Sequence, residues 1–469
     1  MKSYKVTLFL FSCIGVLALL CILFPRDGVQ AAGTTLSFPT LTEVLTSADA
    51  EASALPAETP EQLLARQMEE MQMKQKTQYL HFFANSPLRM YLPDNDLTFF
   101  DPLFRALENA DQSLVRIVHY GDSQLEGDRI TGRIREELQD TFGGIGPGLL
   151  PFIQTVGSVN TAQSCSVSLR RALAYGPAYD ADSVSLRAGD KRYGPMAQVA
   201  YLTPDSVATI SVSPRSKKEL AMHNRAFTRV TLLAENTSSP LSVTFRGETR
   251  TVQPSPEMQH ITFHVAEPIE RASLSVRGRA NLYGITFSGE NGVTVDNVPM
   301  RGCSGTMFTN ISQKQLSSYY QREGVRLIIM QYGGNSVPYL KNEKGIATYA
   351  AQLKRQIEYL QAAAPDARIL FIGPSDMSTR IKGEWQTYPL LPDIIDAIRT
   401  AANEAGAAYW DMYQVMGGRN SMAQWCQEQP PLAGSDHIHF TFKGSERVAD
   451  LFCKSLMLYY DYYQWRKTN

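Results

Sequence analysis

Ser123 is the first residue whose surroundings suggest catalysis. It lies in the segment His119–Gln124, which follows the apolar, β-branched run Leu114–Val118 and precedes residues 130–138, where isoleucine or leucine recurs at every fourth position. These patterns predict a buried strand, a sharp turn and an amphipathic helix. Such a turn exposes the serine hydroxyl and directs the N–H groups of the helix N-terminus at developing negative charge. The alternative is a turn in which Asp122 or Ser123 only caps the helix.

A carboxylate and an imidazole lie close together near the end of the chain. Asp436 and His439 are three positions apart in the segment Gly434–Phe440, so one turn of chain can bring them into contact. A serine nucleophile requires a general base of near-neutral pKa, and that base requires a carboxylate to fix its tautomer. His437 and His439 could instead bind a metal, but no second cluster supplies the remaining ligands. We therefore expect no metal site and interpret His437 as a supporting or surface residue.

Two glycine-containing loops follow predicted strands and contain candidate donors to an oxyanion. The segment Gln331–Ser336 comes directly after a strand, and Asn335 can point its amide into the crevice at the carboxyl end of that strand, where ligands of open α/β sheets bind. Taken alone, this segment also fits an ordinary Gly-Asn turn. The segment Arg301–Thr306 follows another predicted strand, and a glycine there can bring a backbone N–H close to a substrate. Gly302 and Gly305 compete for this role.

These loops require a sheet whose strands end side by side. Three further apolar runs are each followed by a helical pattern, namely Val325–Met330, Ala367–Ile372 and Ala407–Trp410. Strands that alternate with helices indicate a parallel sheet covered on both faces. We expect the last helix to run from about Gly444 to Tyr460.

Residues 156–290 have a different pattern. Apolar and polar residues alternate there with a period of two, and turn residues separate the runs. This pattern is typical of an antiparallel β-sandwich. The alternating positions are Ile210/Val212, Leu241/Val243/Phe245, Ile261/Phe263/Val265, Leu274/Val276 and Ile285/Phe287. The sequence therefore predicts an all-β domain inserted into an α/β domain.

The charge balance and the N-terminus narrow the class of protein. The 469 residues include 45 basic and 46 acidic side chains, so no net field favours nucleic acid, and none is expected as a partner. Lys2 and Lys5 precede the apolar run Val6–Phe24, as in an export signal. Cleavage after Ala31 and retention as a membrane anchor both fit this segment. Either outcome places the rest of the chain outside the cytoplasm, in the periplasm or cell envelope, secreted or anchored.

The predicted organisation has five parts. A helix is expected to start near Thr59 and to continue through Tyr79. Four cysteines follow the signal segment, and the sequence does not choose among their three possible pairings. The parts are 1–31, a signal peptide or signal anchor; 32–89, a tether and helical stalk; 90–155, the first part of the α/β domain; 156–290, the inserted β-sandwich, which we expect to bind glycan; and 291–469, the second part of the α/β domain.

Taken in chain order, the chemical segments resemble the four sequence blocks of the SGNH (GDSL) hydrolase superfamily. Ser123, Gly305, Asn335 and the pair Asp436/His439 match the blocks in order. The resemblance implies a three-layer α/β/α sandwich, a triad of Ser123, Asp436 and His439, and an oxyanion hole formed by Ser123, Gly305 and Asn335. Gly305 fits the family's Ser-Gly-Thr-like pattern better than Gly302 does. The sequence departs from the family in Gln124, where leucine is usual, and in Ser336, where aspartate is frequent.

Within this superfamily the sequence is most similar to bacterial peptidoglycan O-acetylesterases. Those proteins are also exported, carry a β-sandwich resembling a carbohydrate-binding module between the first two blocks, and have a Gly-Ile-Gly segment, here within Gly144–Gly148. The resemblance implies a serine esterase that removes O-acyl groups, above all O-acetyl, from an envelope glycan such as peptidoglycan, without a cofactor. Two alternatives stay open: an O-acyltransferase with the same triad, and a non-catalytic cell-surface protein that binds glycan.

Overall fold

The candidate residues lie in the larger of two compact units, Met1–Gln78 and Tyr79–Asn469. The structure is a computed structural model. It describes residues 3–31, 34–44, 46, 60–154, 156–176, 185–203, 207–215, 224–236 and 238–469.

The smaller unit contains an N-terminal helix and a short hairpin. Helix α1 spans Ser3–Leu23, and strands β1 (Val29–Ala31) and β2 (Thr34–Leu36) pair antiparallel. Helix α3 (Pro60–Asn85) begins in this unit and ends in the larger one. Residues 47–59, which form much of the predicted tether, lie outside the described residues. Within the described ranges, no helix is both long and apolar enough to span a bilayer. The signal peptide or anchor stays a prediction.

A six-stranded sheet forms the centre of the larger unit, with strand order β17-β4-β18-β19-β22-β3. The strands are β3 (Met90–Tyr91), β4 (Leu114–Gly121), β17 (Gly292–Pro299), β18 (Val325–Gln331), β19 (Arg368–Ile372) and β22 (Ala408–Trp410). Neighbouring strands are parallel, except that the edge strand β3 is antiparallel to β22. Strand β4 lies between β17 and β18, so the first part of the α/β domain is enclosed by the second.

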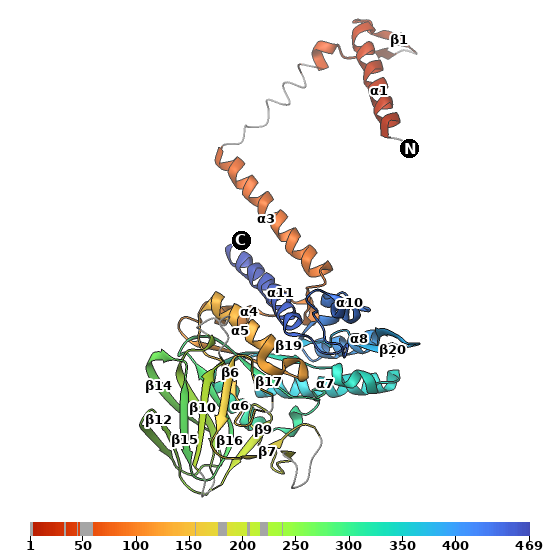
Figure 1. The fold of residues 1–469 in the computed structure, drawn as a ribbon. Coiled ribbons are helices and arrows are strands. Elements are labelled where there is room, and N and C mark those ends of the chain that lie inside the picture. The colour runs from red at the N-terminus through yellow and green to blue at the C-terminus, as the bar shows by residue number, and fades with distance from the viewer. Residues whose placement is uncertain are drawn as a thin grey trace. The chain divides into compact units, whose positions relative to one another are not determined.

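Helices cover both faces of this sheet, which makes three layers (Figure 1). Successive residues of a strand face opposite sides, so Ile329 packs in one core and Ile328 in the other. One face carries α4 (Asp101–Glu108), α5 (Arg129–Phe142) and α11 (Phe442–Thr468), with the short α9 (Met412–Met416) and α10 (Ser421–Gln427). The other face carries α6 (Gln313–Arg322), α7 (Glu343–Ala363) and α8 (Leu391–Glu404). The predicted α/β/α architecture is confirmed, and α11 is longer than expected at both ends.

The chain between the two parts of the α/β domain forms a sandwich of two sheets, whose strands pair antiparallel except for one parallel pair, β7 with β8. One sheet has the order β13-β12-β15-β10-β6, and the other has β14-β11-β16-β9-β7-β8, with β5 also paired to β16. The strands are β5 (Gly148–Leu150), β6 (Thr161–Cys165), β7 (Arg170–Leu173), β8 (Ser185–Leu186), β9 (Gln198–Leu202), β10 (Val207–Pro214), β11 (Phe227–Glu235), β12 (Leu241–Phe245), β13 (Glu248–Val252), β14 (Gln259–Ile269), β15 (Ala272–Arg277) and β16 (Ala280–Ser288). Because β5 pairs with β16, the sandwich sheet begins upstream of the expected boundary at residue 156.

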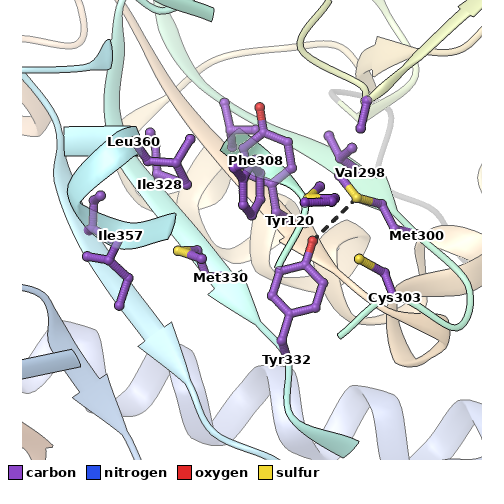
Figure 2. Close-up of a cluster of buried hydrophobic side chains, with 14 of the residues drawn as sticks. Tyr120, Val298, Met300, Cys303, Phe308, Ile328, Met330, Tyr332, Ile357 and Leu360 are labelled. Carbon is purple, nitrogen blue, oxygen red and sulfur yellow. Dashed lines mark hydrogen bonds between the residues drawn. The ribbon is translucent and has the colours of Figure 1, made fainter. Parts of the chain in front are cut away.

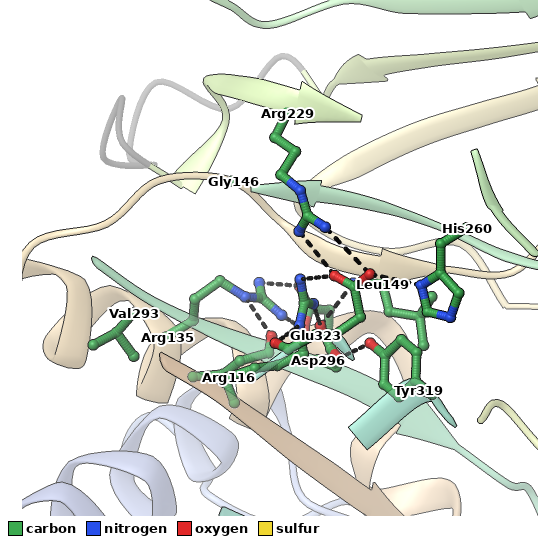
Figure 3. A network of polar contacts seen from close by, with 12 residues as sticks. Arg116, Arg135, Gly146, Leu149, Arg229, His260, Val293, Asp296, Tyr319 and Glu323 are labelled. Atoms are coloured by element: carbon green, nitrogen blue, oxygen red, sulfur yellow. Dashed lines mark hydrogen bonds and ion pairs between the residues drawn. The ribbon is translucent and has the colours of Figure 1, made fainter. Parts of the chain in front are cut away.

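A buried ionic network joins the sandwich to the α/β domain (Figure 3). Arg116 on β4 binds Asp296 on β17, with 2.6 Å between Nη1 and Oδ1. Glu323, just after α6, accepts from Arg229 of β11 at 2.8 Å and contacts Nδ1 of His260 of β14 at 2.9 Å. Burial alone would raise the pKa of Glu323, but the bond to His260 and the charges of Arg116 and Arg229 lower it to about 2. The two domains therefore share one set of buried charges.

Candidate active site

The loop after β4 positions Ser123. The strand ends at Gly121, where a side chain would come within 2.7 Å of Leu125, and the 3-10 helix η2 (Ser123–Asp128) follows at once. Asp122 caps this turn, because its Oδ1 accepts the Gln124 N–H at 3.0 Å. The prediction that the amphipathic helix starts at the serine is wrong in detail. Helix α5 begins only at Arg129, after a left-handed Asp128, so the first N–H groups beyond the nucleophile belong to the 3-10 turn.

Ser123, His439 and Asp436 form one chain of hydrogen bonds. The Ser123 Oγ lies 2.8 Å from Nε2 of His439, and Nδ1 of the same ring lies 2.7 Å from Oδ2 of Asp436. When Nδ1 donates to the carboxylate, Nε2 is free to accept the serine proton. Oδ1 of Asp436 accepts the backbone N–H groups of Ile438 and His439, both at 3.0 Å. Partial burial would raise the pKa of Asp436, but these hydrogen bonds lower it overall.

Gln124 holds the segment that carries the histidine. Its Nε2 donates to the Ile438 carbonyl at 2.8 Å, and its Oε1 accepts the Phe440 N–H at 3.2 Å. One amide thus binds the backbone on both sides of His439. Arg129 at the start of α5 adds a third bond, from Nη1 to the Phe440 carbonyl at 2.8 Å. The sequence showed Gln124 only as a departure from the family pattern, and no local pattern links it to a residue more than 300 positions away.

Asn335 lies in the same crevice and is oriented by a buried carboxylate. Its Nδ2 donates to Oδ2 of Asp122 at 3.0 Å and to the Cys303 carbonyl at 3.1 Å. Burial raises the pKa of Asp122 to about 6, against the lowering effect of the hydrogen bonds from Gln124 and Asn335. Asp122 therefore binds both the turn that holds Ser123 and the amide of Asn335.

The structure places the two candidate glycines differently. Gly305 has φ of 80°, and a Cβ there would lie 2.7 Å from the Tyr332 ring, so only glycine fits over that ring. Its N–H donates to the Cys303 sulfur at 3.4 Å. A hydrogen bond from the Tyr332 hydroxyl to the Met300 sulfur, 3.5 Å long, holds this ring in place (Figure 2). Gly302, rather than Gly305, lines the cavity that contains Ser123. The oxyanion role of Gly305 stays a prediction.

The catalytic candidates open into one cavity of about 910 Å³, a volume that includes its mouth. It lies at the carboxyl ends of the parallel strands, where ligands of open α/β sheets bind. The lining includes Asp122, Ser123, Gln124, Arg301, Gly302, Asn335, Tyr339, Met377 and His439. Tyr339 on its rim is 81% exposed.

His437, two positions before His439, does not line this cavity. Its ring stacks on Trp385 with 4.0 Å between centroids, and its Nδ1 lies 3.5 Å from the Cys426 sulfur. Trp385 belongs to a hairpin of β20 (Ser378–Ile381) and β21 (Glu384–Thr387), which the sequence pattern did not predict. Across the described part of the chain, no cluster of three or more potential ligands is arranged to hold a metal.

Comparisons with known proteins identify one matching family. Residues 268–447 match the family model described as GDSL-like Lipase/Acylhydrolase family. The matched region contains Asn335, Asp436 and His439, whereas Ser123 lies upstream, beyond the inserted sandwich. No curated protein matches the chain.

The chain also matches solved structures. One, described as a peptidoglycan O-acetylesterase in action, superposes with a TM-score of 0.63 at 18% identity, covering 77% of this chain and 96% of the other. A carbohydrate esterase family 2 enzyme with a carbohydrate-binding domain from Corynascus thermopiles (Myceliophthora fergusii) matches with a TM-score of 0.26 at 14% identity, covering 56% and 99%. The family match, with the first of these folds, confirms the resemblance to SGNH hydrolases. The chain is an enzyme of the carboxylic ester hydrolase class.

Proposed function

We propose that this protein is an exported serine esterase that removes O-acetyl groups from a cell-envelope glycan such as peptidoglycan. The observation that carries the proposal is the contact of 2.8 Å between the Ser123 hydroxyl and Nε2 of His439, backed by Asp436. The basic and apolar N-terminal segment supports export. The superposition on a structure described as a peptidoglycan O-acetylesterase supports the choice of substrate.

The first half of the reaction transfers the acyl group to the enzyme. The Ser123 oxygen attacks the ester carbonyl while His439 takes the serine proton, and Asp436 stabilises the resulting imidazolium. The oxyanion accepts hydrogen bonds from the Ser123 N–H and a glycine N–H of the 302–305 loop, and from the Asn335 amide once one of its two N–H groups leaves the Asp122 carboxylate or the Cys303 carbonyl. Each such donor contributes about 3 kcal/mol to transition-state stabilisation. His439 then protonates the departing sugar oxygen, which leaves an acetyl ester on Ser123.

The second half returns the enzyme to its starting state. Water attacks the acetyl-serine carbonyl, and His439 takes a proton from this water and returns one to Ser123 as acetate leaves. A sugar hydroxyl in place of water would make the same protein an acyltransferase.

Acetate release from O-acetylated peptidoglycan tests the proposal. The purified chain is compared with Ser123→Ala and with Ser113→Ala, which changes an exposed serine just before β4. We expect release by the wild type and by Ser113→Ala, and none by Ser123→Ala when its unfolding midpoint is unchanged. Activity on an aryl acetate alone would retain the triad and reject peptidoglycan as substrate. Acceleration by a hydroxyl acceptor would identify a transferase, and silence on all substrates would refute catalysis by Ser123.

A further inference from the structure

A second cavity lies where the sandwich meets the α/β domain. Its volume is about 680 Å³ when the open solvent at its mouth is included. Its walls come from the end of η2, from β5 and the segment after it, and from the sandwich strands β7 and β9. Leu149 and Met196 supply apolar surface, and Arg171 and Gln198 supply polar groups.

This junction cavity adjoins the catalytic cavity. Arg301 lines both cavities, and its Nη1 lies 3.3 Å from Oε2 of Glu126. Ser123 and Glu126 lie three positions apart in η2, and they line the catalytic and the junction cavity respectively. The Arg301 side chain is 73% exposed, so the boundary between the two cavities is a side chain in contact with solvent. A polymer held at Ser123 can therefore continue past Arg301 into the junction cavity.

The junction cavity contains a guanidinium without a counter-charge. The Arg171 Nε is buried and has no hydrogen-bond partner, and no carboxylate of the described ranges forms an ion pair with Arg171. The other arginines of the cavity differ, since Arg135 binds both oxygens of Asp128, at 2.9 and 3.1 Å, and Arg301 binds Glu126. Partial burial of an unpaired charge is costly, so this cation is poised to bind an anion.

The neighbours of Arg171 favour a carboxylate as that anion. A guanidinium binds a carboxylate through two parallel hydrogen bonds. Tyr175, which also lines the cavity, senses the charge of Arg171, and burial raises the pKa of its phenol to about 12. The phenol therefore stays protonated and can donate a hydrogen bond to a carboxylate that Arg171 binds. Gln198 adds an amide to this polar side of the cavity.

We propose that the junction cavity is a second subsite for the substrate polymer, in which Arg171 binds a carboxylate carried next to the acylated sugar. The proposal rests on the proposed function and identifies the class of substrate as an acylated glycan with carboxylates. In peptidoglycan strands that have lost their stem peptides this group is the lactyl carboxylate of muramic acid, and in other envelope polymers it is the carboxylate of a uronic acid.

Turnover provides the first test. Arg171→Gln is compared with Arg170→Gln, which removes the same charge from the exposed neighbour on β7, outside the cavity. The assay measures kcat/KM on O-acetylated muramic-acid oligosaccharides and on neutral acetylated chito-oligosaccharides. We expect the ratio of the two values to fall about tenfold in Arg171→Gln and to keep its wild-type value in Arg170→Gln. Equal losses on both substrates, or equal effects of both substitutions, would overturn the proposal.

Binding without turnover separates this proposal from the proposed function. N-acetylmuramic acid, N-acetylglucosamine and glucuronic acid are titrated into the full chain by calorimetry. Binding of an acid that Arg171→Gln weakens tenfold or more, with no binding of N-acetylglucosamine, supports the subsite even if no ester is hydrolysed. Preference for glucuronic acid would identify a uronic-acid polymer as the source of the carboxylate. If neither acid binds, or if Arg171→Gln binds them as well as the wild type, the subsite is refuted.

Discussion

Replacing Gln124 by leucine removes the amide that binds the backbone on both sides of His439, the proposed general base. Leucine is the usual family residue and has a similar size, so the substitution deletes hydrogen bonds rather than volume. The Phe440 N–H loses its partner in a buried environment, and the Ile438 carbonyl loses one in a partly buried environment. A buried group left without its bond costs about 1–3 kcal/mol. We expect the free energy of unfolding to fall by about 2–4 kcal/mol.

The effect on the rate arises from the position of His439. Displacement of a catalytic group by about 1 Å can cost about a hundredfold in rate. Arg129 still binds the Phe440 carbonyl, so the segment keeps one of its three bonds. We therefore expect kcat/KM for an aryl acetate to fall by about ten- to a hundredfold in Gln124→Leu, measured well below the unfolding transition.

Gln139→Leu is the matched control. Gln139 on α5 is a buried glutamine whose Nε2 donates to the carbonyls of Val293 and Gly146, at 3.0 and 3.3 Å, away from the triad. Because the buried Oε1 of Gln139 has no hydrogen-bond partner, this variant should lose no more stability than Gln124→Leu, and it should keep wild-type kcat/KM. If both variants lose stability and neither loses activity, Gln124 has no positioning role and the argument fails. If Gln124→Leu changes neither quantity, the hydrogen bonds themselves are refuted.

Three further predictions concern buried charges and glycines. Glu323→Gln should lower the free energy of unfolding by about 3–5 kcal/mol at pH 7. The pKa of Glu323 is about 2 in the folded protein, below its unfolded value, so the stability difference between wild type and variant should disappear as pH falls from about 4.5 towards 2. Urea unfolding at pH 7 and near pH 2 measures this difference. Burial raises the pKa of Asp122 to about 6, so the free energy of unfolding of the wild type should fall by about 3 kcal/mol relative to that of Asp122→Asn as pH rises from 4 to 7. If urea unfolding gives the same difference between the two proteins at both pH values, the burial of this carboxyl is contradicted. Gly305→Ala must displace Tyr332 and should reduce kcat about a hundredfold. Gly302→Ala has open space at its Cβ, so it should cost only about 1–2 kcal/mol of stability. A lower kcat in Gly302→Ala than in Gly305→Ala would reject Gly305 as the oxyanion donor.

The alternation of apolar and polar residues predicted the strands that have one buried and one exposed face. The strands that alternate apolar and polar residues, such as β12 and β15, have one face in the sandwich core and one in solvent. Strand β11 was missed because it does not alternate. Leu232 packs in the sandwich core and Leu233 in the core shared with the α/β domain, so both faces are apolar. The edge strand β3 has only two residues, too few to form any period.

The site was predicted as a set of residues but not as a geometry. The spacing of Asp436 and His439 is local, so the sequence revealed their contact. The contact of Ser123 with His439 spans 316 positions, and only the resemblance to a family joined these residues. Gln124 had no such signal, because the atoms that it binds belong to the backbone and any residue could stand at positions 438 and 440. Arg171 was missed for a similar reason, since an arginine on a strand is ordinary until its surroundings are known.

The position of β4 between two later strands has a consequence for synthesis in the cell. Strand β4 ends at Gly121, but neither of its neighbours begins before Gly292. Translation proceeds at about 5–20 residues per second, so this apolar strand waits roughly ten to thirty seconds for a partner. The sandwich can fold during that interval, which leaves β4 and α5 as an exposed apolar segment that is prone to aggregation. We expect the nascent chain to depend on a holding chaperone until β18 emerges.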